Sequence, residues 1–306
     1  EDLLVSPQIS GLLGTGAPPF VNAGVVENKG LEFAIGYSDN LSENFKFNIK
    51  YNVTTLKNEV LEVSGEGEYL EGGGFGISQP AISRMEAGFP MGYFIGYKTD
   101  GVFQNQSEVD NSAVTKLGAR PGDLKFVDQN GDGVIDLDDR VNLGNPIPDA
   151  TMGLNISFDY KNFDFSAYTF ASIGNEIVRN YERNQQLVNK PIWYLDRWTG
   201  EGTNNSSPLH TIGATSNTVF SDFYVEDGSF VRLQNIQLGY TFSENVLSNP
   251  KISKLRLYIS ASNVFTLTEY KGYDPTIGNG APIGGGIDNG FYPSASTFLL
   301  GLNVKF

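Results

Sequence analysis

The chain has 306 residues, 36 of them glycine, and contains no cysteine. The lack of cysteine excludes a disulfide framework, thiol catalysis and any cysteine metal site. The formal net charge of −14 at pH 7 argues against nucleic acid as a partner, because phosphate binding needs clustered lysine and arginine. No window comes near the roughly 20 apolar residues that a transmembrane helix requires.

Alternation of apolar and polar side chains is the strongest pattern along the chain. Residues 1–24 show no usable period and are predicted to form a loop, whereas many later stretches place an apolar residue at every second position. This period is typical of strands with one apolar and one wet face. The nine predicted strands are 31–37, 45–53, 81–87, 93–97, 152–160, 163–167, 236–242, 255–261 and 297–306. We therefore predict an all-β fold.

The predicted connections alternate between short and long. The short ones are 39–43, 88–92, 160–162 and 243–253, and the long ones are 58–80, 104–150, 174–229 and 266–296. Outer-membrane barrels show this asymmetry, with short periplasmic turns and longer extracellular loops. Aromatic and leucine residues at strand ends also fit an interface girdle. We predict a transmembrane antiparallel β-barrel, with a soluble β-sandwich as the alternative.

The last strand shows the pattern most clearly, because its second face is small or polar apart from Leu299. Its apolar face ends on the aromatic Phe306, which a membrane strand would place at the interface girdle. Extending the alternation to the preceding strand, we expect lipid contact for Leu255, Leu257, Ile259, Leu300, Leu302 and Val304. The residues expected to face the lumen are Arg256, Tyr258, Asn303 and Lys305.

An odd number of strands also predicts the direction of the first one. If strand 297–306 ends in the periplasm, counting back makes strand 31–37 run the same way, so the chain enters the barrel from outside. Bacterial barrels have an even number of strands with both ends inside, and lipid does not tolerate an open sheet edge. We expect a C-terminal barrel portion, completed by strands from the same polypeptide or from another.

One metal motif lies within loop 104–150. Residues 128–139 read DQNGDGVIDLDD, which supplies the oxygen ligands and the sharp-turn glycine of a calcium loop. The expected ligands are Asp128, Asn130, Asp132, Asp136, Asp139 and the carbonyl of Val134. The last ligand is aspartate instead of glutamate and the preceding residues look extended, so we expect a weak structural Ca²⁺ site without EF-hand helices. The alternative is an acidic turn that holds no ion.

The long loop 174–229 holds the remaining candidates. Trp193, Tyr194 and Trp198 would be able to stack on a substrate or contact a partner, or they would form a small core of the loop itself. The single histidine, His210, has no cysteine or second histidine with which to build a catalytic or zinc site. Spacing supports no glycosidase carboxylate pair. We therefore predict that the protein is not an enzyme.

Several motifs together resemble one family. The run Arg84–Tyr97, RMEAGFPMGYFIGY, resembles the segment Glu-x-Gly-x-Pro-x-Gly-x-Phe-x-Gly-Tyr of SusC/RagA-type TonB-dependent transporters. Further similar segments follow in order: Gly122–Asp128 with the calcium-type loop, Gly144–Pro148, Tyr224–Leu233, Asn263–Thr266 and Tyr273–Pro275. The resemblance covers about Val25 to Phe306.

The resemblance implies a barrel of 22 strands in the cell outer membrane with an N-terminal plug. It further implies a SusD-like lipoprotein lid and import of glycans or peptides powered by TonB. The plug and the TonB-contacting region are absent from this sequence, and Phe306 becomes the expected recognition signal for membrane insertion. In this reading 1–24 is an extracellular lead-in and 25–306 contributes the C-terminal strands. A secreted calcium-dependent β-sandwich that binds or adheres is the rival, and purification without detergent would favour it.

Overall fold

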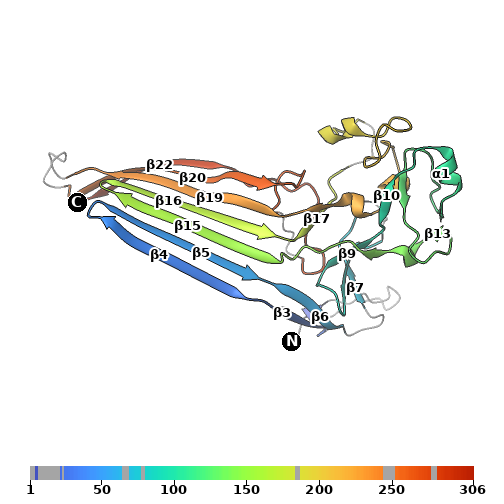
Figure 1. The fold of residues 1–306 in the computed structure, drawn as a ribbon, viewed down its shortest axis with the longest axis horizontal. Coiled ribbons are helices and arrows are strands. Elements are labelled where there is room, and N and C mark those ends of the chain that lie inside the picture. Colours follow the sequence, from blue (N-terminus) through green and yellow to red (C-terminus); the bar gives the residue numbers. More distant parts are fainter. Residues whose placement is uncertain are drawn as a thin grey trace, which may run out of the picture.

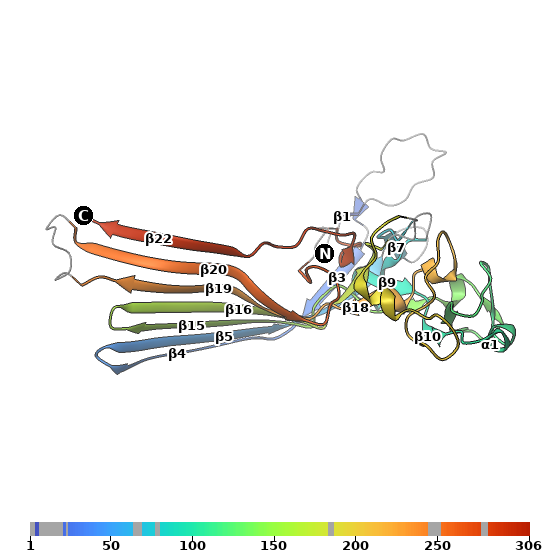
Figure 2. The ribbon, with the colours of Figure 1, turned by 90° about the horizontal axis from the view of Figure 1, so that it is seen from above.

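The computed structural model describes residues 4–5, 21–22, 24–63, 69–76, 80–182, 187–243, 252–276 and 281–306. Two parts are evident: a long sheet and, at one end of it, a globular head (Figures 1 and 2). We define the head as the described residues within 24–30, 56–149, 174–229 and 269–296. Of the predicted lead-in 1–24, β1 (Leu4–Val5) pairs with β2 (Val21–Asn22), and most of the remainder lies outside the described residues.

The long sheet has seven strands among the described residues, and every neighbouring pair is antiparallel. From edge to edge they are β22 (Thr297–Lys305), β20 (Lys254–Thr268), β19 (Phe230–Thr241), β16 (Phe163–Ile173), β15 (Ala150–Tyr160), β5 (Phe45–Thr55) and β4 (Glu32–Ser42). Strands of 9 to 15 residues alternate direction between the head and a set of turns at the opposite end (Figure 1).

The register gathers the apolar side chains onto one face. One row of paired residues crosses six strands: Leu302, Leu257, Tyr240, Phe163, Tyr160 and Phe45. Leu300 is 72% exposed and Ile259 is 55% exposed, so this face has no second protein layer over it. A β-sandwich would bury the same residues against its other sheet. The predicted membrane-barrel fold, in partial form, is therefore the one observed.

Two of the nine predicted strands do not join this sheet, which corrects the strand count to seven. Segments 81–87 and 93–97 form β8 (Ser83–Glu86) and β9 (Tyr93–Gly96) in the head. With β7 (Tyr69–Gly72) and β14 (Val141–Asn142) they make a four-stranded sheet. All four residues of β9 are buried, because protein covers both of its faces. Because two strands are removed from the predicted nine, the number of strands in the sheet is still odd. The strands β4 and β22 therefore run in the same direction, as predicted.

Short strands and single helical turns build the rest of the head. Its remaining strands are β3 (Gly24–Lys29), β6 (Lys57–Val63), β10 (Thr99–Val102), β11 (Val114–Thr115), β12 (Leu124–Phe126), β13 (Val134–Ile135), β17 (Glu176–Arg179), β18 (Val225–Asp227) and β21 (Ile287–Asp288). Its helical segments are α1 (Gln106–Asp110), η2 (Leu137–Asp139), η3 (Ile192–Asp196), η4 (Ser216–Thr218) and η5 (Asp222–Tyr224). No helix in the described ranges is long and apolar enough to cross a membrane.

Segments far apart in the sequence share the apolar interior of the head. One cluster joins Phe75, Phe94, Val178, Phe220 and Ile287, which come from five separate stretches of chain. A second cluster, of Val102, Leu124, Phe126 and Ile135, includes one residue of the calcium-type loop, Ile135, and packs against Trp198. The head is therefore a folded unit with its own core.

Candidate functional site

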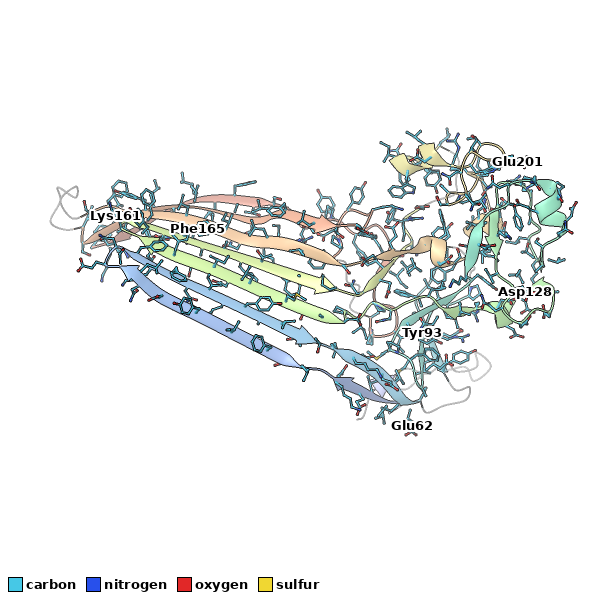
Figure 3. All side chains as sticks on the ribbon, in the orientation of Figure 1. Glu62, Tyr93, Asp128, Lys161, Phe165 and Glu201 are labelled. Atoms are coloured by element: carbon cyan, nitrogen blue, oxygen red, sulfur yellow. The ribbon has the colours of Figure 1, made fainter. Side chains whose placement is uncertain are left out.

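The calcium-type loop lies at the end of the head farthest from the sheet, where Figure 3 labels Asp128. The Asp128 carboxylate accepts hydrogen bonds from the backbone N–H groups of Gly131, at 2.6 Å, and Gly133, at 2.8 Å. Both glycines have positive φ, 77° and 84°, a conformation that favours glycine. Backbone donation, led by Gly133, lowers the pKa of Asp128 below its usual range. The carboxylate is therefore charged at neutral pH and fixed in place.

Asp139 closes the other end of the loop. It is fully buried, and its two oxygens accept from the N–H groups of Gln129, at 2.7 Å, and Asp136, at 2.8 Å. Between these anchors, Asn130 accepts from Asp132 N–H at 2.9 Å. Asp132 in turn accepts from Val134 N–H at 2.8 Å, and Asp136 accepts from Asp138 N–H at 2.9 Å. The predicted ligands therefore share one compact turn.

The donor chemistry of this turn suits a hard cation, since carboxylate and amide oxygens are the ligands that calcium prefers. Each oxygen that accepts one N–H keeps a second lone pair. Across the described part of the chain, however, no three His, Cys, Asp or Glu side chains converge closely enough to hold a metal ion. The loop has the right residues in a closed conformation, and the ion itself stays a prediction.

The three predicted aromatic contact residues do not form one platform. Trp198 packs against the second core cluster and donates its indole N–H to Gln104 Oε1 at 3.2 Å. Trp193 and Tyr194 both belong to η3. The Trp193 ring lies edge-on to Tyr181, with centroids 6.4 Å apart, and 5.4 Å from the Arg179 guanidinium carbon. These contacts agree with the alternative reading of the aromatics as a small core of the loop.

Sequence reasoning missed the buried charge cluster that anchors η3. Arg179 is 2% exposed and forms ion pairs with Glu182, at 2.5 Å, and with Glu226. The Tyr194 hydroxyl donates to Glu182 at 2.8 Å, and burial together with this carboxylate raises the pKa of Tyr194. The spacing of Arg179 and Glu182 offered a weak local signal. Glu226 lies 47 residues from Arg179, and a single sequence gives no sign of that pairing.

Two of the hollows on the surface of the head lie beside helical segments. The larger, of about 730 Å³, lies beside η3, and the residues that line it include Lys190, Ile192, Tyr194, Leu195, Arg197 and His210. The other, of about 480 Å³, lies beside α1, and the residues that line it include Asp100, Gln104, Glu108, Lys125, Asn204 and Asn205. The first combines aliphatic side chains with basic ones, whereas the second is mainly polar.

The second face of the long sheet carries the polar side chains predicted to line a lumen. Arg256 pairs in register with Asn303, and Tyr258 pairs with Gly301. The Arg256 guanidinium also reaches across β19 to Asp164 on β16, with Nε 2.8 Å from Oδ1. Gly239 lies between them on β19, and a Cβ there would overlap both side chains. The expected division into an apolar and a polar face is therefore present in the sheet.

Phe306 follows β22 directly and is 85% exposed. It lies at the end of the sheet that carries the tight turns, opposite the head (Figure 1). The apolar face of the same strand continues through Phe298, which is 77% exposed. An exposed ring at a strand end has the location expected of an interface aromatic residue.

Comparison with known sequences gives relatives along the whole chain. No family model matches it. TonB-dependent receptor P3 of Formosa agariphila is 32% identical over 319 residues, covering 100% of this chain and 31% of that protein. TonB-dependent receptor SusC of Bacteroides thetaiotaomicron is 30% identical over 311 residues, covering 100% and 29%. The chain thus spans about a third of the length of the curated relatives it matches.

Solved structures give the same fold. The RagAB peptide transporter matches with a TM-score of 0.77 at 19% identity, covering 100% of this chain and 32% of that one. The RagAB peptide importer in its "closed-closed" state matches with a TM-score of 0.74 at 19% identity, covering 100% and 32%. The sheet and the head are therefore both features of an already known architecture.

Proposed function

The chain is related over its whole length to TonB-dependent receptors of the SusC/RagA type, and on this premise we propose that it forms the C-terminal part of an outer-membrane barrel that imports glycans or peptides. The observation that carries the proposal is the continuous apolar face of the seven-stranded sheet. That face is exposed in the chain, and contact with lipid would stabilise it without a second protein layer.

The sheet edges support the same proposal. In the described residues, β4 and β22 each pair with a single neighbour in the long sheet. Unpaired backbone groups at such edges are costly in hydrocarbon, so a barrel in lipid needs further strands to close it. We assign those strands, the plug and the contact with TonB to the part of the receptor outside this chain.

The head supports a second element of the proposal, a SusD-like lipoprotein lid. It lies at the end of the sheet opposite the tight turns, which is the extracellular end if the turns are periplasmic (Figure 1). A folded head with its own core offers a rigid surface to a lid and a wall to the solute path. Trp193, Tyr194 and Trp198 are our candidates for supporting such contacts, through η3 and the segment after it.

The test uses the full-length receptor in its own cell. We expect it in the outer-membrane fraction, and we expect deletion of its gene to abolish uptake of at least one fluorescent glycan or peptide. The purified protein should need detergent and migrate faster before heating than after it on SDS gels, as a closed barrel does. A detergent-free soluble monomer would contradict the membrane proposal and favour the adhesive β-sandwich.

We also propose that Ca²⁺ binds the loop 128–139 and orders it without taking part in chemistry. Four carboxylates, those of Asp128, Asp132, Asp136 and Asp139, repel one another within this loop unless a cation neutralises them. Removing calcium with a chelator should speed protease cleavage in loop 104–150 and leave the barrel intact. Equal cleavage rates together with no calcium by metal analysis would leave only an acidic turn.

A separate proposal concerns Phe306 as the signal for insertion into the outer membrane. Deleting this residue removes the exposed aromatic ring at the strand end and leaves the paired part of β22 unchanged. We expect less assembled barrel, measured as the heat-modifiable fraction in the outer membrane. Replacing Phe306 with Tyr, which keeps an aromatic ring, should preserve assembly. Unchanged assembly after the deletion would contradict the proposal.

A further inference from the structure

The hollow beside η3 is large enough to hold a small ligand. Its volume of about 730 Å³ falls within the range of sites that hold small molecules. The segment that forms it, yellow in Figure 1, stands out from the rest of the head. A ligand reaching the head from outside would therefore meet this segment without first passing through the sheet.

The hollow is basic in a chain of net charge −14. Lys190 and Arg197 line it, and so does His210. Burial is the first cause that lowers the pKa of His210, and the positive charges of Lys190 and Arg197 lower it further. Glu182, a buried acid nearby, pairs with Arg179 and accepts from the Tyr194 hydroxyl, and its charge also acts on Lys190 and His210. The described residues that line the hollow include two cations and no carboxylate, so the hollow favours an anion.

Arg197 is held in place with donors to spare. One of its terminal nitrogens donates to the backbone carbonyl of Tyr194 at 3.0 Å. A guanidinium has five N–H donors in a planar fork, and such a fork matches the two oxygens of a carboxylate. Lys190 also lies near Tyr194, with its Nζ 5.4 Å from the ring centroid. Both cations therefore contact Tyr194, Arg197 at its backbone carbonyl and Lys190 at its ring.

The aromatic side chains here are already occupied by the protein. The Tyr194 ring has the Lys190 ammonium and the His210 ring, 5.0 Å away between centroids, as neighbours. The Trp193 ring contacts Tyr181 and Arg179. A sugar usually needs an open aromatic face on which to stack. The arrangement disfavours a carbohydrate as the principal ligand.

Aliphatic side chains are the exposed apolar surface of the hollow. Ile192 is 79% exposed and Leu195 is 73% exposed. Residues three apart in a 3₁₀ helix lie in line along one side, so both project from the same side of η3. An aliphatic group covering them would remove this apolar surface from water.

We propose that the hollow binds an acidic peptide, with a carboxylate between Lys190 and Arg197 and an aliphatic side chain against Ile192 and Leu195. The inference rests on the proposed import function and narrows its substrate to peptides that carry carboxylates. The hollow acts as a capture site on the head, so peptide meets it before entering the barrel.

The test measures binding of two fluorescent tetrapeptides to the full-length receptor, isolated with any partner that co-purifies. One peptide alternates leucine with aspartate, and its twin alternates leucine with asparagine. We expect the acidic peptide to bind about 10-fold more tightly, as paired ionic contacts allow. The double variant Lys190→Gln/Arg197→Gln should remove this advantage. The control Lys98→Gln/Lys116→Gln changes the net charge equally at exposed head positions and should leave the advantage intact.

Two further arms separate the parts of the proposal. The variant Ile192→Ser/Leu195→Ser should weaken both peptides alike, because both carry leucine. Hexagalacturonate, an anion without aliphatic side chains, should bind more weakly than the acidic peptide. Equal binding of the twin peptides, equal loss in the control variant, or tighter binding of hexagalacturonate would overturn the inference.

Failure of the inference is distinguishable from failure of the proposed function. Every variant lies in the head, so each should still give a heat-modifiable barrel in the outer membrane. A receptor that inserts and imports, yet binds the twin peptides alike, refutes the acidic-peptide site alone. A receptor that does not reach the outer membrane refutes the import function itself.

Discussion

The long sheet and the head place apolar and polar side chains in opposite ways. In the sheet, leucine and aromatic residues stay exposed on one face, and 11 of the 11 residues of β15 pair in unbroken register with β16. In the head, strands are short and polar groups are buried, among them Arg179, Asp139 and Asp288. The sheet depends on a repeated pattern and an apolar surrounding, whereas the head depends on particular pairs of residues.

Substitutions in the head and in the sheet should therefore lower stability for different reasons. A buried charge in the head needs its partner, because an ion without a counter-charge is poorly solvated there. An exposed leucine in the sheet needs only an apolar environment. The face of the sheet on which it lies therefore matters more than which apolar residue it is. Substitutions of matched residues in the two parts therefore test this difference.

The largest expected effect comes from removing the buried cation of the head. Arg179→Met leaves Glu182 and Glu226 buried together without their shared partner. Breaking such a pair costs about 3–5 kcal/mol. We expect hydrogen exchange to speed up throughout the contacts of η3 and β17, while the long sheet keeps its protection.

Lys271 provides the matched control, since it also approaches Glu226, at 3.9 Å, but its side chain is 59% exposed. Lys271→Met should cost less than about 1 kcal/mol, as exposed ion pairs usually do. Similar exchange in the two variants would show that the head does not depend on the buried cluster.

A second prediction compares two neighbouring leucines of β22. Leu300 pairs in register with Ile259 on the apolar face, and Leu299 pairs with Ser260 on the polar face. If the apolar face meets lipid near the bilayer midplane, Leu300→Arg should cost about 2–4 kcal/mol and Leu299→Arg much less. The measurement is urea unfolding of the receptor folded into lipid vesicles. Equal costs would mean that the two faces share one environment.

The sheet was largely predictable from the sequence because the two faces of each strand differ in chemistry, as the two leucines of β22 illustrate. Period-two alternation identifies any strand with two unlike faces, and seven such segments are indeed in the sheet. The pattern does not say what covers the apolar face. Strands β8 and β9 were therefore assigned to the barrel, although protein encloses Phe94 and Met85 completely.

The head was predictable only where its chemistry is local. Loop 128–139 was predicted because its candidate ligands lie within one short run, and the structure holds them in one turn. The calcium ion itself stays a prediction. The Arg179 cluster was missed because Glu226 comes from a distant strand. The basic hollow was missed in the same way, since His210 and Lys190 are 20 residues apart and become neighbours only through the fold of η3.

The smallest expected effect concerns Gly239, where the sheet departs from pure pattern and depends on a particular pair, as the head does. The Arg256–Asp164 ion pair crosses β19 over this glycine, and a Cβ would displace both side chains. These side chains have flexible ends and are partly exposed, at 14% and 31%. Gly239→Ala should therefore cost only about 1 kcal/mol or less in urea unfolding, because the ion pair is weakened and the backbone is not forced to move.

A double-mutant cycle decides whether the ion pair is the reason for the glycine. In the background Asp164→Asn/Arg256→Gln the crossing side chains carry no ionic attraction, so Gly239→Ala has nothing ionic to disturb. We expect the cost of the alanine to fall toward zero, or to become a small gain, since alanine suits a strand better than glycine. An unchanged cost in both backgrounds would place the requirement for glycine in the backbone of β19. The polar face of the sheet would then not depend on this ion pair. The sheet would differ from the head, which depends on particular residue pairs, more strongly than the ion pair suggests.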